Sequence, residues 1–560
     1  MSRVLGVVVA RPVVVLDGRT MSCAQVSEVA RGSASATVTR EGIERARAAA
    51  QTVADVAARR EVYGRTTGVG ANRDQPVAAD DLEEHGFRLL RSHAGGSGPL
   101  IAAEASRAML VVRANQIAVG GSGVDPGVLG PLLDGVNAGL SVPVPRYGAI
   151  GTGDLTALAV AALCLLGERD WLLPAAWPGS VPQPRFPLAS ADALAFLSSN
   201  AATVGEAALA CCDLAGLLRA AVVIAALSHC AVSASTEPYA AAVHEARRYP
   251  GQRAVAAALR GLLGSDLGPA RRIQDPYGYR ALPQVHGPAV DAVRDANRAV
   301  TAELNAAAEN PLVDVAAKTV WHNGNFHTAY VGLAMDAVRA ALFQTAALSA
   351  ARLGTLVEPA FTGLAPFLAT DPPPSSGIMI LEYVAHSAIA DIRRLAAPAA
   401  LGSAVLSRGV EEHAGFSTQS SRATSDVVDA YRVTLACELV AAVRALRLRA
   451  VTPARPGLAA AFDLAAGVLP ADTADRALDG DLTIAHALLP GLANLTGPLD
   501  PAGPVNPAGP LDPAGPATPL LFEAPSSAAW IRPRPEPAAA PPPGRPGRTP
   551  AARRPGGRPA

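Results

Sequence analysis

Residues 201–226 read AATVGEAALACCDLAGLLRAAVVIAA, an apolar stretch that contains no proline and only scattered polar side chains. Alanine and leucine favour the α-helix, and an apolar surface on nearly every side is typical of a helix buried inside a large bundle. Five further stretches of similar composition predict long helices at 154–168, 287–310, 330–353, 377–395 and 425–449. The sequence therefore predicts a mainly α protein with a long-helix bundle as its core.

Composition divides the 560 residues into three regions. We expect a smaller, loop-rich N-terminal region at 1–200, the long-helix bundle at 201–480, and a disordered tail rich in proline, alanine and glycine at 481–560. Within the tail, the hexapeptides LDPAGP, VNPAGP and LDPAGP follow one another over 499–516. Proline at this density prevents both helices and β-ladders.

Composition also limits the partners of the chain. Lys and Arg together number 48, as do Asp and Glu, so the charge balance gives no reason to expect a nucleic acid. The longest apolar run, 207–227, is interrupted by Asp213 and Arg219, which argues against a membrane span. The six cysteines form no CxxC pair, so neither zinc nor disulfides are indicated. We expect a cytoplasmic protein with no metal, no nucleotide cofactor, and neither nucleic acid nor membrane as a partner.

Four polar segments interrupt the apolar helices, and polar loops at helix ends are where function concentrates. They are VYGRTTGVG at 62–70, GAIGTGDL at 148–155, QDPYGYRALPQVHG at 274–287 and HNGNFH at 322–327. Each alone is ordinary loop chemistry, and the first lacks the lysine of a phosphate-binding loop. Together in one chain they predict a polar site at helix ends.

The motifs in these segments resemble those of the histidine and aromatic amino acid ammonia-lyases, a family that includes related aminomutases. YGxxTGxG, RSHAxGxG (91–98), GDL, QDxYxxR, PQVHG, NPL (310–312) and GNFH occur in the family's order. The resemblance extends over residues 21–446 and implies the ammonia-lyase architecture, which is similar to that of fumarase and aspartase. It also implies a homotetramer whose active sites each draw on three subunits, and an amino acid as the substrate.

Such a reaction needs an unusual electrophile. Ammonia elimination must remove a β-proton that is barely acidic and expel a poor leaving group, and no ordinary side chain is electrophilic enough to assist. In the family, a methylidene-imidazolone ring supplies the electrophile and forms autocatalytically from an Ala-Ser-Gly loop. The resemblance places this 4-methylidene-imidazol-5-one-type ring at Gly151-Thr152-Gly153.

The resemblance also implies roles for individual side chains. Tyr63 would remove the β-proton, although a phenol with an ordinary pKa of about 10 needs help from its surroundings to act as a base. Arg280 would bind the substrate carboxylate, where a guanidinium can form two parallel hydrogen bonds. Tyr277 and Gln274 would support the electrophile and the substrate, and Phe326 would lie beside the ring.

Two positions depart from the family pattern. Where the family reads GSVGASGDL, this chain reads GAIGTGDL, one residue shorter, so that glycine and threonine replace alanine and serine. Dehydration of Thr152 would leave an ethylidene group, which is bulkier and less electrophilic than a methylidene. The second departure lies at the family's active-site asparagine. Ungapped counting aligns Ser198 with it, and Asn200 could serve if the helix is shifted.

Two residues bear on the substrate. His93 occupies the family's selectivity position and suits a polar ring, either the imidazole of histidine or the phenol of tyrosine. Glu411 resembles a carboxylate that accompanies histidine as substrate, but it is also compatible with an exposed acidic turn. We therefore predict an ammonia-lyase that converts L-histidine or L-tyrosine into the α,β-unsaturated acid.

Several alternatives stay open, and one is excluded. A tyrosine 2,3-aminomutase uses the same residues and differs only in whether ammonia adds back before the product leaves. A non-catalytic family member lacking the ring would explain the changes at Thr152 and Ser198. A lyase of the fumarase and aspartase type requires a GSSxMPxKxN loop, which cannot be present because Lys318 is the only lysine.

Overall fold

The computed structural model describes residues 11–175, 182–264 and 271–499. All of these residues belong to the first of the two units into which the chain divides. The proline-rich repeats lie almost entirely outside the described residues, so the predicted disorder of that part of the tail stays a prediction.

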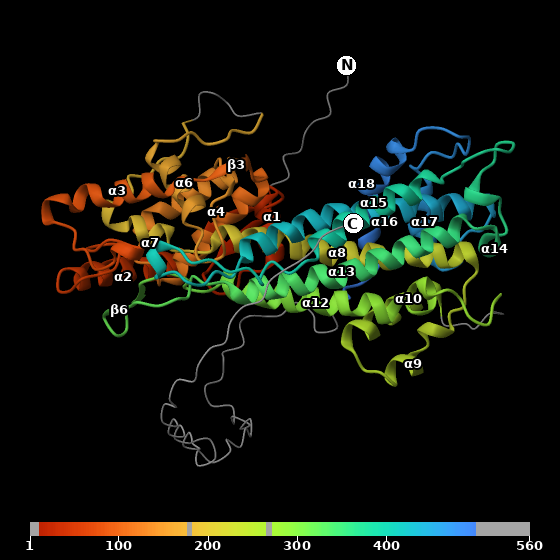
Figure 1. Ribbon diagram of the computed structural model, residues 1–560, viewed down its shortest axis with the longest axis horizontal. Helices are drawn as coiled ribbons and strands as arrows, with labels where there is room; N and C mark the ends of the chain where they lie inside the picture. The colour runs from red at the N-terminus through yellow and green to blue at the C-terminus, as the bar shows by residue number, and fades with distance from the viewer. Residues whose placement is uncertain (1–10, 176–181, 265–270, 500–560) are drawn as a thin grey trace, which may run out of the picture. The chain divides into compact units, whose positions relative to one another are not determined.

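The core of the first unit is a bundle of long helices that lie side by side in Figure 1. They are α8 (Ala201–Val232), α12 (Leu282–Leu304), α13 (Ala329–Val357), α15 (Ile380–Leu395) and α16 (Ser417–Leu448). Helix α16 packs against α8, α13 and α15. The predicted mainly α fold with a long-helix bundle is confirmed.

Small residues set the spacing of these helices. Ala207, Ala208, Ala220 and Ala221 of α8 are all buried. At Gly205, an added Cβ would lie only 2.9 Å from the backbone nitrogen of Met109, so the backbones of α8 and α4 (Ala103–Val119) approach closely. Close packing through alanine and glycine explains how a chain with few aromatic residues fills its core.

The N-terminal region consists of shorter helices and two small sheets. The helices are α1 (Cys23–Ala30), α2 (Arg40–Ala57), α3 (Leu82–His93), α4 (Ala103–Val119), α5 (Leu129–Asn137), α6 (Leu155–Leu166) and α7 (Ala193–Leu197). Strand β1 (Val13–Leu16) pairs in parallel with β2 (Ser35–Val38), and β3 (Ser97–Leu100) pairs antiparallel with β4 (Pro145–Tyr147). A third pair, β5 (Leu312–Asp314) and β6 (Thr319–Trp321), is antiparallel and follows α12.

Shorter helices surround the bundle, namely α9 (Ala241–Glu245), α10 (Pro250–Leu263), α11 (Tyr277–Arg280), α14 (Pro359–Thr362), α17 (Pro456–Ala466) and α18 (Asp479–Ala493). Helix α18 corrects the predicted boundary at residue 481, because it continues past that point and packs on α8 and α16. Its residues Ala485, Leu489 and Leu492 are buried at helical spacing.

Two predicted helices begin at different residues from those expected. Helix α16 begins at Ser417 rather than at 425, because the polar residues of its first turns are buried against the site described below. Helix α12 begins at Leu282, and Pro283 occupies the first turn, where a missing N–H costs nothing.

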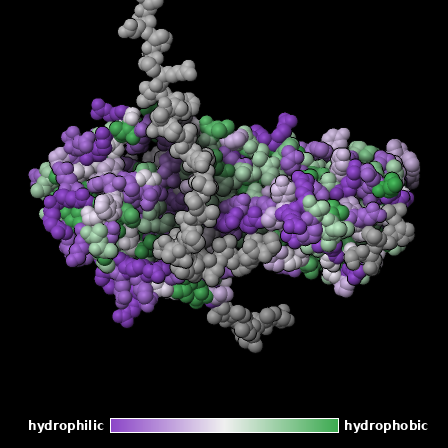
Figure 2. All heavy atoms as spheres, turned by 90° about the horizontal axis from the view of Figure 1, so that it is seen from below, coloured by the Kyte–Doolittle hydropathy of each residue, from purple (hydrophilic) through white to green (hydrophobic). Residues whose placement is uncertain are grey.

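Two described segments are long and apolar enough to cross a membrane by length and composition alone, namely 190–232 and 329–357. In the first segment, 72% of the most apolar stretch of 18 residues is buried inside the structure. In the second segment, the buried share of that stretch is 50%. That burial is expected of core helices. On the face drawn in Figure 2, hydrophilic and hydrophobic residues are interspersed. All six cysteines are free.

Candidate active site

A cavity of about 1270 Å³ lies where loops of the N-terminal region meet the ends of the long helices. Predicted site residues from separate parts of the sequence line it: Tyr63, His93, Thr152, Gly153, Ser198, Phe326 and Glu411. The fold therefore brings the first, second and fourth polar segments into one place.

The turn at Gly151-Thr152-Gly153 depends on its two glycines. Gly151 has φ +83° and Gly153 has φ +95°, in the left-handed region that side chains rarely adopt. At Gly151 an added Cβ would lie 2.3 Å from Oγ of Ser417. The carbonyl oxygen of Gly151 accepts from both the N–H and the hydroxyl of Thr328, at 3.4 and 3.3 Å.

The N-termini of three long helices converge on this turn. Helix α13 begins directly after Thr328, which bonds to Gly151, and α16 begins directly after Phe416, whose N–H donates to the carbonyl of Ile150 at 2.8 Å. In the first turn of α8, Thr203 donates its N–H to the Asp154 carboxylate at 2.7 Å. Helix N-termini carry partial positive charge, which stabilises negative charge that develops nearby.

Asp154 is fully buried, and its other carboxylate oxygen accepts from the hydroxyl of Thr203 at 2.8 Å. Burial raises the pKa of this carboxyl. The carboxylate thus ties the end of the glycine turn to α8 rather than capping α6, the helix that it precedes.

Tyr63 is half-buried, and its hydroxyl oxygen accepts from the N–H of Gly70 at 2.8 Å. Burial raises the pKa of the Tyr63 phenol, and the hydrogen bond from Gly70 opposes that shift. Glu411 also lies close to Gly70, where an added Cβ would be 3.0 Å from its Oε1. Phenol and carboxylate therefore both lie near one backbone position of the cavity wall.

The tautomer of His93 follows from its contacts. Its Nδ1 lies 2.9 Å from the carbonyl oxygen of Leu89, which can only accept. Nδ1 therefore carries the proton, and in the neutral ring Nε2 keeps its lone pair.

Two further histidines of the cavity form a pair that the sequence reasoning missed. Nε2 of His327 lies 2.9 Å from Nδ1 of His413, and the rings are 5.0 Å apart. Burial, together with His413, lowers the pKa of His327. His327 belongs to the HNGNFH segment and His413 to VEEH, so their residue types were visible, but nothing local showed that the two segments meet. Among the described residues, no group of three or more His, Cys, Asp or Glu is arranged to bind a metal ion.

Ser198 and Asn200, the two candidates for the family's asparagine, have different surroundings. Ser198 lines the cavity, and its hydroxyl accepts from the N–H of Asn310 at 2.9 Å. The side chain of Asn200 instead lies in a buried network, accepting from Gln116 at 2.9 Å and donating to Glu303 at 2.8 Å. Only the serine reaches the cavity within one chain.

Gln274, Tyr277 and Arg280 do not join the cavity in this chain. The carbonyl of Gly278 accepts from Arg352 at 3.2 Å, and Arg352 is 24 positions beyond Thr328 along α13. At 1.5 Å per residue, this separation is about 36 Å. The third polar segment therefore lies near the opposite end of the bundle from the glycine turn.

Arg280 and Tyr277 contact each other at an exposed part of the chain. The Arg280 guanidinium lies 4.5 Å from the centre of the Tyr277 ring, and Tyr277 is 66% exposed. Nε of Arg280 is buried and has no hydrogen-bond partner among the described residues. Gln274 is also exposed. The Arg280 guanidinium therefore has hydrogen-bonding capacity that the described residues do not use.

The chain is similar in sequence and in fold to several known proteins. Residues 21–466 match the family described as aromatic amino acid lyase. The chain is 34% identical over 491 residues to the histidine ammonia-lyase of Geobacillus thermodenitrificans, which covers 85% of this chain and 97% of that protein. Among solved structures, it is similar to histidine ammonia-lyase from Trypanosoma cruzi, with a TM-score of 0.80, 28% identity, and coverage of 87% and 96%. It is also similar to tyrosine aminomutase from Streptomyces globisporus, with a TM-score of 0.79, 27% identity, and coverage of 86% and 97%.

Proposed function

Because this chain belongs to the aromatic amino acid lyase family and is a carbon–nitrogen lyase, we propose that it removes ammonia from L-histidine to give the α,β-unsaturated acid. The observation that carries the proposal is the cavity lined jointly by Tyr63, Thr152 and Glu411. A phenol, a carboxylate and the candidate ring position are the groups that this reaction needs.

The residues at 151–153 fit an electrophilic ring. Gly151 and Gly153 give the turn the backbone freedom that closure requires, and Thr328 polarises the Gly151 carbonyl by two hydrogen bonds. The ring, formed from Gly151, Thr152 and Gly153, would supply an electrophile that ordinary side chains lack. Thr152 would give the ring a methyl group that the serine of the family does not.

Tyr63 is proposed as the base that takes the β-proton. Its hydroxyl faces the N–H of Gly70, which stabilises the phenolate by donating to it. Burial works in the opposite direction by raising the pKa. The phenolate is therefore a minor form at neutral pH, and the rate should rise with pH.

Histidine as substrate is supported by two residues. His93 offers the lone pair of Nε2, which can accept from the protonated nitrogen of an imidazole. The Glu411 carboxylate can bind the other side of the ring through a charge-assisted hydrogen bond. The similarity to proteins named histidine ammonia-lyase also supports histidine, rather than tyrosine, as the substrate of this chain.

The substrate carboxylate requires a second chain. We propose a homotetramer in which Gln274, Tyr277 and Arg280 of one subunit complete the cavity of another. The support is the separation of about 36 Å along α13, which no side chain can span. Large exposed apolar side chains on α13 (Tyr330 and Leu333) and on α15 (Tyr383) favour burial against another subunit. A cytoplasmic location also stays a proposal, and six free cysteines are compatible with it.

The test combines a mass measurement with a turnover assay. The intact mass and a peptide map of 147–158 should show loss of two waters at 151–153, and the protein should release ammonia from L-histidine. Thr152→Ser should keep the loss of both waters and raise turnover, whereas Thr152→Ala cannot lose the second water and should have no turnover. Formation of a β-amino acid from L-tyrosine would indicate the aminomutase instead. An unmodified mass without product from histidine, tyrosine or phenylalanine would leave a non-catalytic family member.

A further inference from the structure

The segment that enters the glycine turn lies along the first turns of α16. The N–H of Phe416 donates to the carbonyl of Ile150 at 2.8 Å. The side-chain amide of Gln419 donates through Nε2 to the carbonyl of Ala149, also at 2.8 Å. Two successive carbonyls of the segment are therefore bound by the residue directly before α16 and by a side chain of its first turn.

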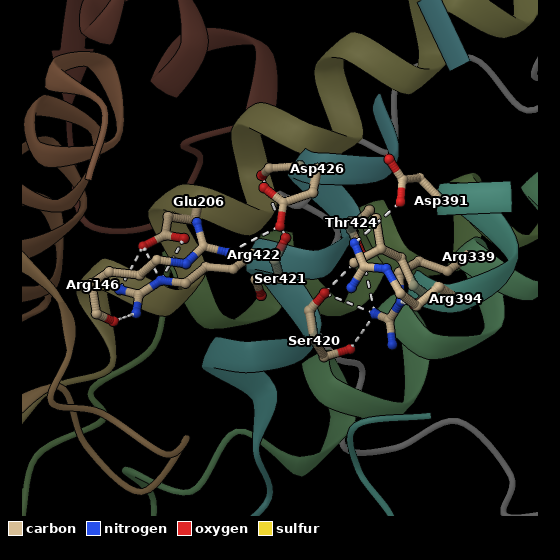
Figure 3. A network of polar contacts seen from close by, with 12 residues as sticks. Arg146, Glu206, Arg339, Asp391, Arg394, Ser420, Ser421, Arg422, Thr424 and Asp426 are labelled. Carbon is tan, nitrogen blue, oxygen red and sulfur yellow. Dashed lines mark hydrogen bonds and ion pairs between the residues drawn. The ribbon is translucent and has the colours of Figure 1, made fainter. Parts of the chain in front are cut away.

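Arg422 extends this series by one more turn. Its Nη1 donates to the carbonyl of Arg146, as Figure 3 shows. The remaining nitrogens of the guanidinium bind the Glu206 carboxylate of α8 at 3.0 to 3.1 Å. The side chains of Arg422 and Glu206 are only 8% and 6% exposed, so the guanidinium is fixed in place.

The spacing of the three donors explains how the segment is held. Gln419 and Arg422 are three residues apart on α16, so their side chains lie on one side of the helix, and Phe416 donates its backbone N–H from the position directly before that helix. The residue numbers of the acceptors fall from 150 to 146 while those of the donors rise from 416 to 422. The segment therefore runs antiparallel to α16. Three fixed points over five residues leave the segment little freedom before it reaches Gly151.

We propose that Gln419 and Arg422 are positioning residues that hold segment 146–150 so that the turn at Gly151-Thr152-Gly153 can close into its ring. The inference rests on the proposed function, because the ring is part of that proposal. Neither residue is among those lining the cavity, and neither is proposed to touch the substrate.

Ring closure joins the amide nitrogen of Gly153 to the carbonyl carbon of Gly151. The carbonyl oxygen leaves as water with the amide hydrogens of Gly153 and Thr152, and a double bond forms between the Gly151 carbon and the Thr152 nitrogen. The Thr152 hydroxyl leaves as a second water with the α-hydrogen. An amide nitrogen is a weak nucleophile and an amide carbonyl a weak electrophile, so the rate depends on how closely the backbone holds them together.

Two variants of the full-length protein separate this role from a general effect on folding. Gln419→Leu removes the donor to Ala149 with little change in side-chain volume. The double variant Glu206→Leu with Arg422→Met removes the buried ion pair without leaving one charge unpaired, which is often tolerated. The matched control is Arg432→Met, because Arg432 lies on the same helix and pairs with Asp213 and Asp429 instead.

The measurement is the fraction of peptide 147–158 that has lost both waters, at fixed times after a pulse of synthesis, in folded protein. We expect Gln419→Leu to slow ring formation about tenfold, with an unchanged midpoint of thermal unfolding. KM and turnover per ring should equal those of the wild type, and the double variant should behave likewise. Amide hydrogen exchange of the same peptide should be faster in both variants and unchanged in Arg432→Met.

Two outcomes would overturn the inference in different ways. If both folded variants form the ring at the wild-type rate, the positioning role is wrong while the proposed function stands. If the wild type itself keeps an unmodified mass, the ring is absent from the proposed function, and ring closure cannot be what these residues serve. In that case, unchanged hydrogen exchange in the variants would also show that Gln419 and Arg422 do not fix segment 146–150.

Discussion

The hydroxyl oxygen of Tyr63 accepts a hydrogen bond of 2.8 Å from the backbone N–H of Gly70. This contact orients the phenol in the cavity and favours its ionised form, whereas burial raises its pKa. The two effects act on the same oxygen. The ionisation of Tyr63 therefore depends on the backbone at Gly70, which has no side chain.

Replacing Tyr63 tests the proposed base. Tyr63→Phe should lower kcat/KM by about 10²- to 10⁴-fold, the usual contribution of a positioned base. Since only one hydrogen bond is lost, thermal unfolding should change little. In the wild type, kcat/KM should rise as the pH increases toward the raised pKa of Tyr63. Tyr249→Phe, at an exposed tyrosine, is the control, and full turnover by Tyr63→Phe would show that another group is the base.

Restoring the family's alanine at residue 151 should be harmful here. Gly151→Ala places a Cβ 2.3 Å from Oγ and 2.6 Å from the backbone nitrogen of Ser417, at φ +83°. A side chain at such a φ alone costs about 1–2 kcal/mol, and the overlap adds to it. We expect a lower unfolding midpoint and a loss of the dehydrated turn.

Two further variants complete the test of Gly151. Adding Ser417→Gly should rescue Gly151→Ala only in part, because the backbone nitrogen of residue 417 remains. Gly130→Ala is the control, since its Cβ would meet nothing within 4 Å in helix α5. A Gly151→Ala protein as stable as Gly130→Ala would contradict the steric argument.

Arg280 should affect substrate binding more than chemistry. A hydrogen bond to a charged group contributes about 1.5–3 kcal/mol, so Arg280→Met should raise KM by roughly 10- to 100-fold. The control is Arg298→Met, at an exposed arginine paired with Asp295. Steady-state kinetics with L-histidine provides the measurement, and an unchanged KM would remove Arg280 from the binding site.

Because His286 is buried, we expect the free energy of unfolding to fall in acid. The ring is buried, its Nε2 donates to the carbonyl of Leu218 at 3.0 Å, and burial lowers its pKa from 6.5 to about 4. Between these values the unfolded chain binds the proton and the folded chain does not, so the free energy of unfolding falls as the pH falls. The loss should reach about 3 kcal/mol by pH 4.

Replacement of His286 provides the check. In His286→Gln, which keeps a donor but does not titrate, urea unfolding at pH 7 and pH 4.5 should differ less than in the wild type. His386→Gln, at an exposed histidine of α15, should keep the wild-type difference. The same acid sensitivity in both variants would rule out His286 as its source.

The sequence predicted the long helices well because their composition is dominated by good helix formers. It missed the start of α16, since Ser417, Thr418, Ser420 and Ser421 look like a loop, yet all four are buried. Only neighbouring helices explain that burial. In α18, by contrast, the buried positions Ala485, Leu489 and Leu492 already follow a helical period. The proximity of the proline-rich tail obscured this pattern.

The candidate site was predictable in its parts but not in its assembly. Motifs identified Tyr63, Thr152 and Glu411, which the fold brings to one cavity. The pairing of His327 with His413 could not be predicted, because it joins segments 86 residues apart. Nor could local spacing reveal that Arg280 lies a helix length away from that cavity.

The length of α13 has a genetic consequence. A subunit carrying Tyr63→Phe keeps the part of the site that contains Arg280 intact. A subunit carrying Arg280→Met keeps the part that contains Tyr63 intact. When two such impaired proteins are dissociated, mixed and reassembled, some sites in the hybrids of the proposed tetramer would receive both undamaged parts. Partial complementation between the two impaired alleles is therefore expected, which could not occur if each chain enclosed its own active site.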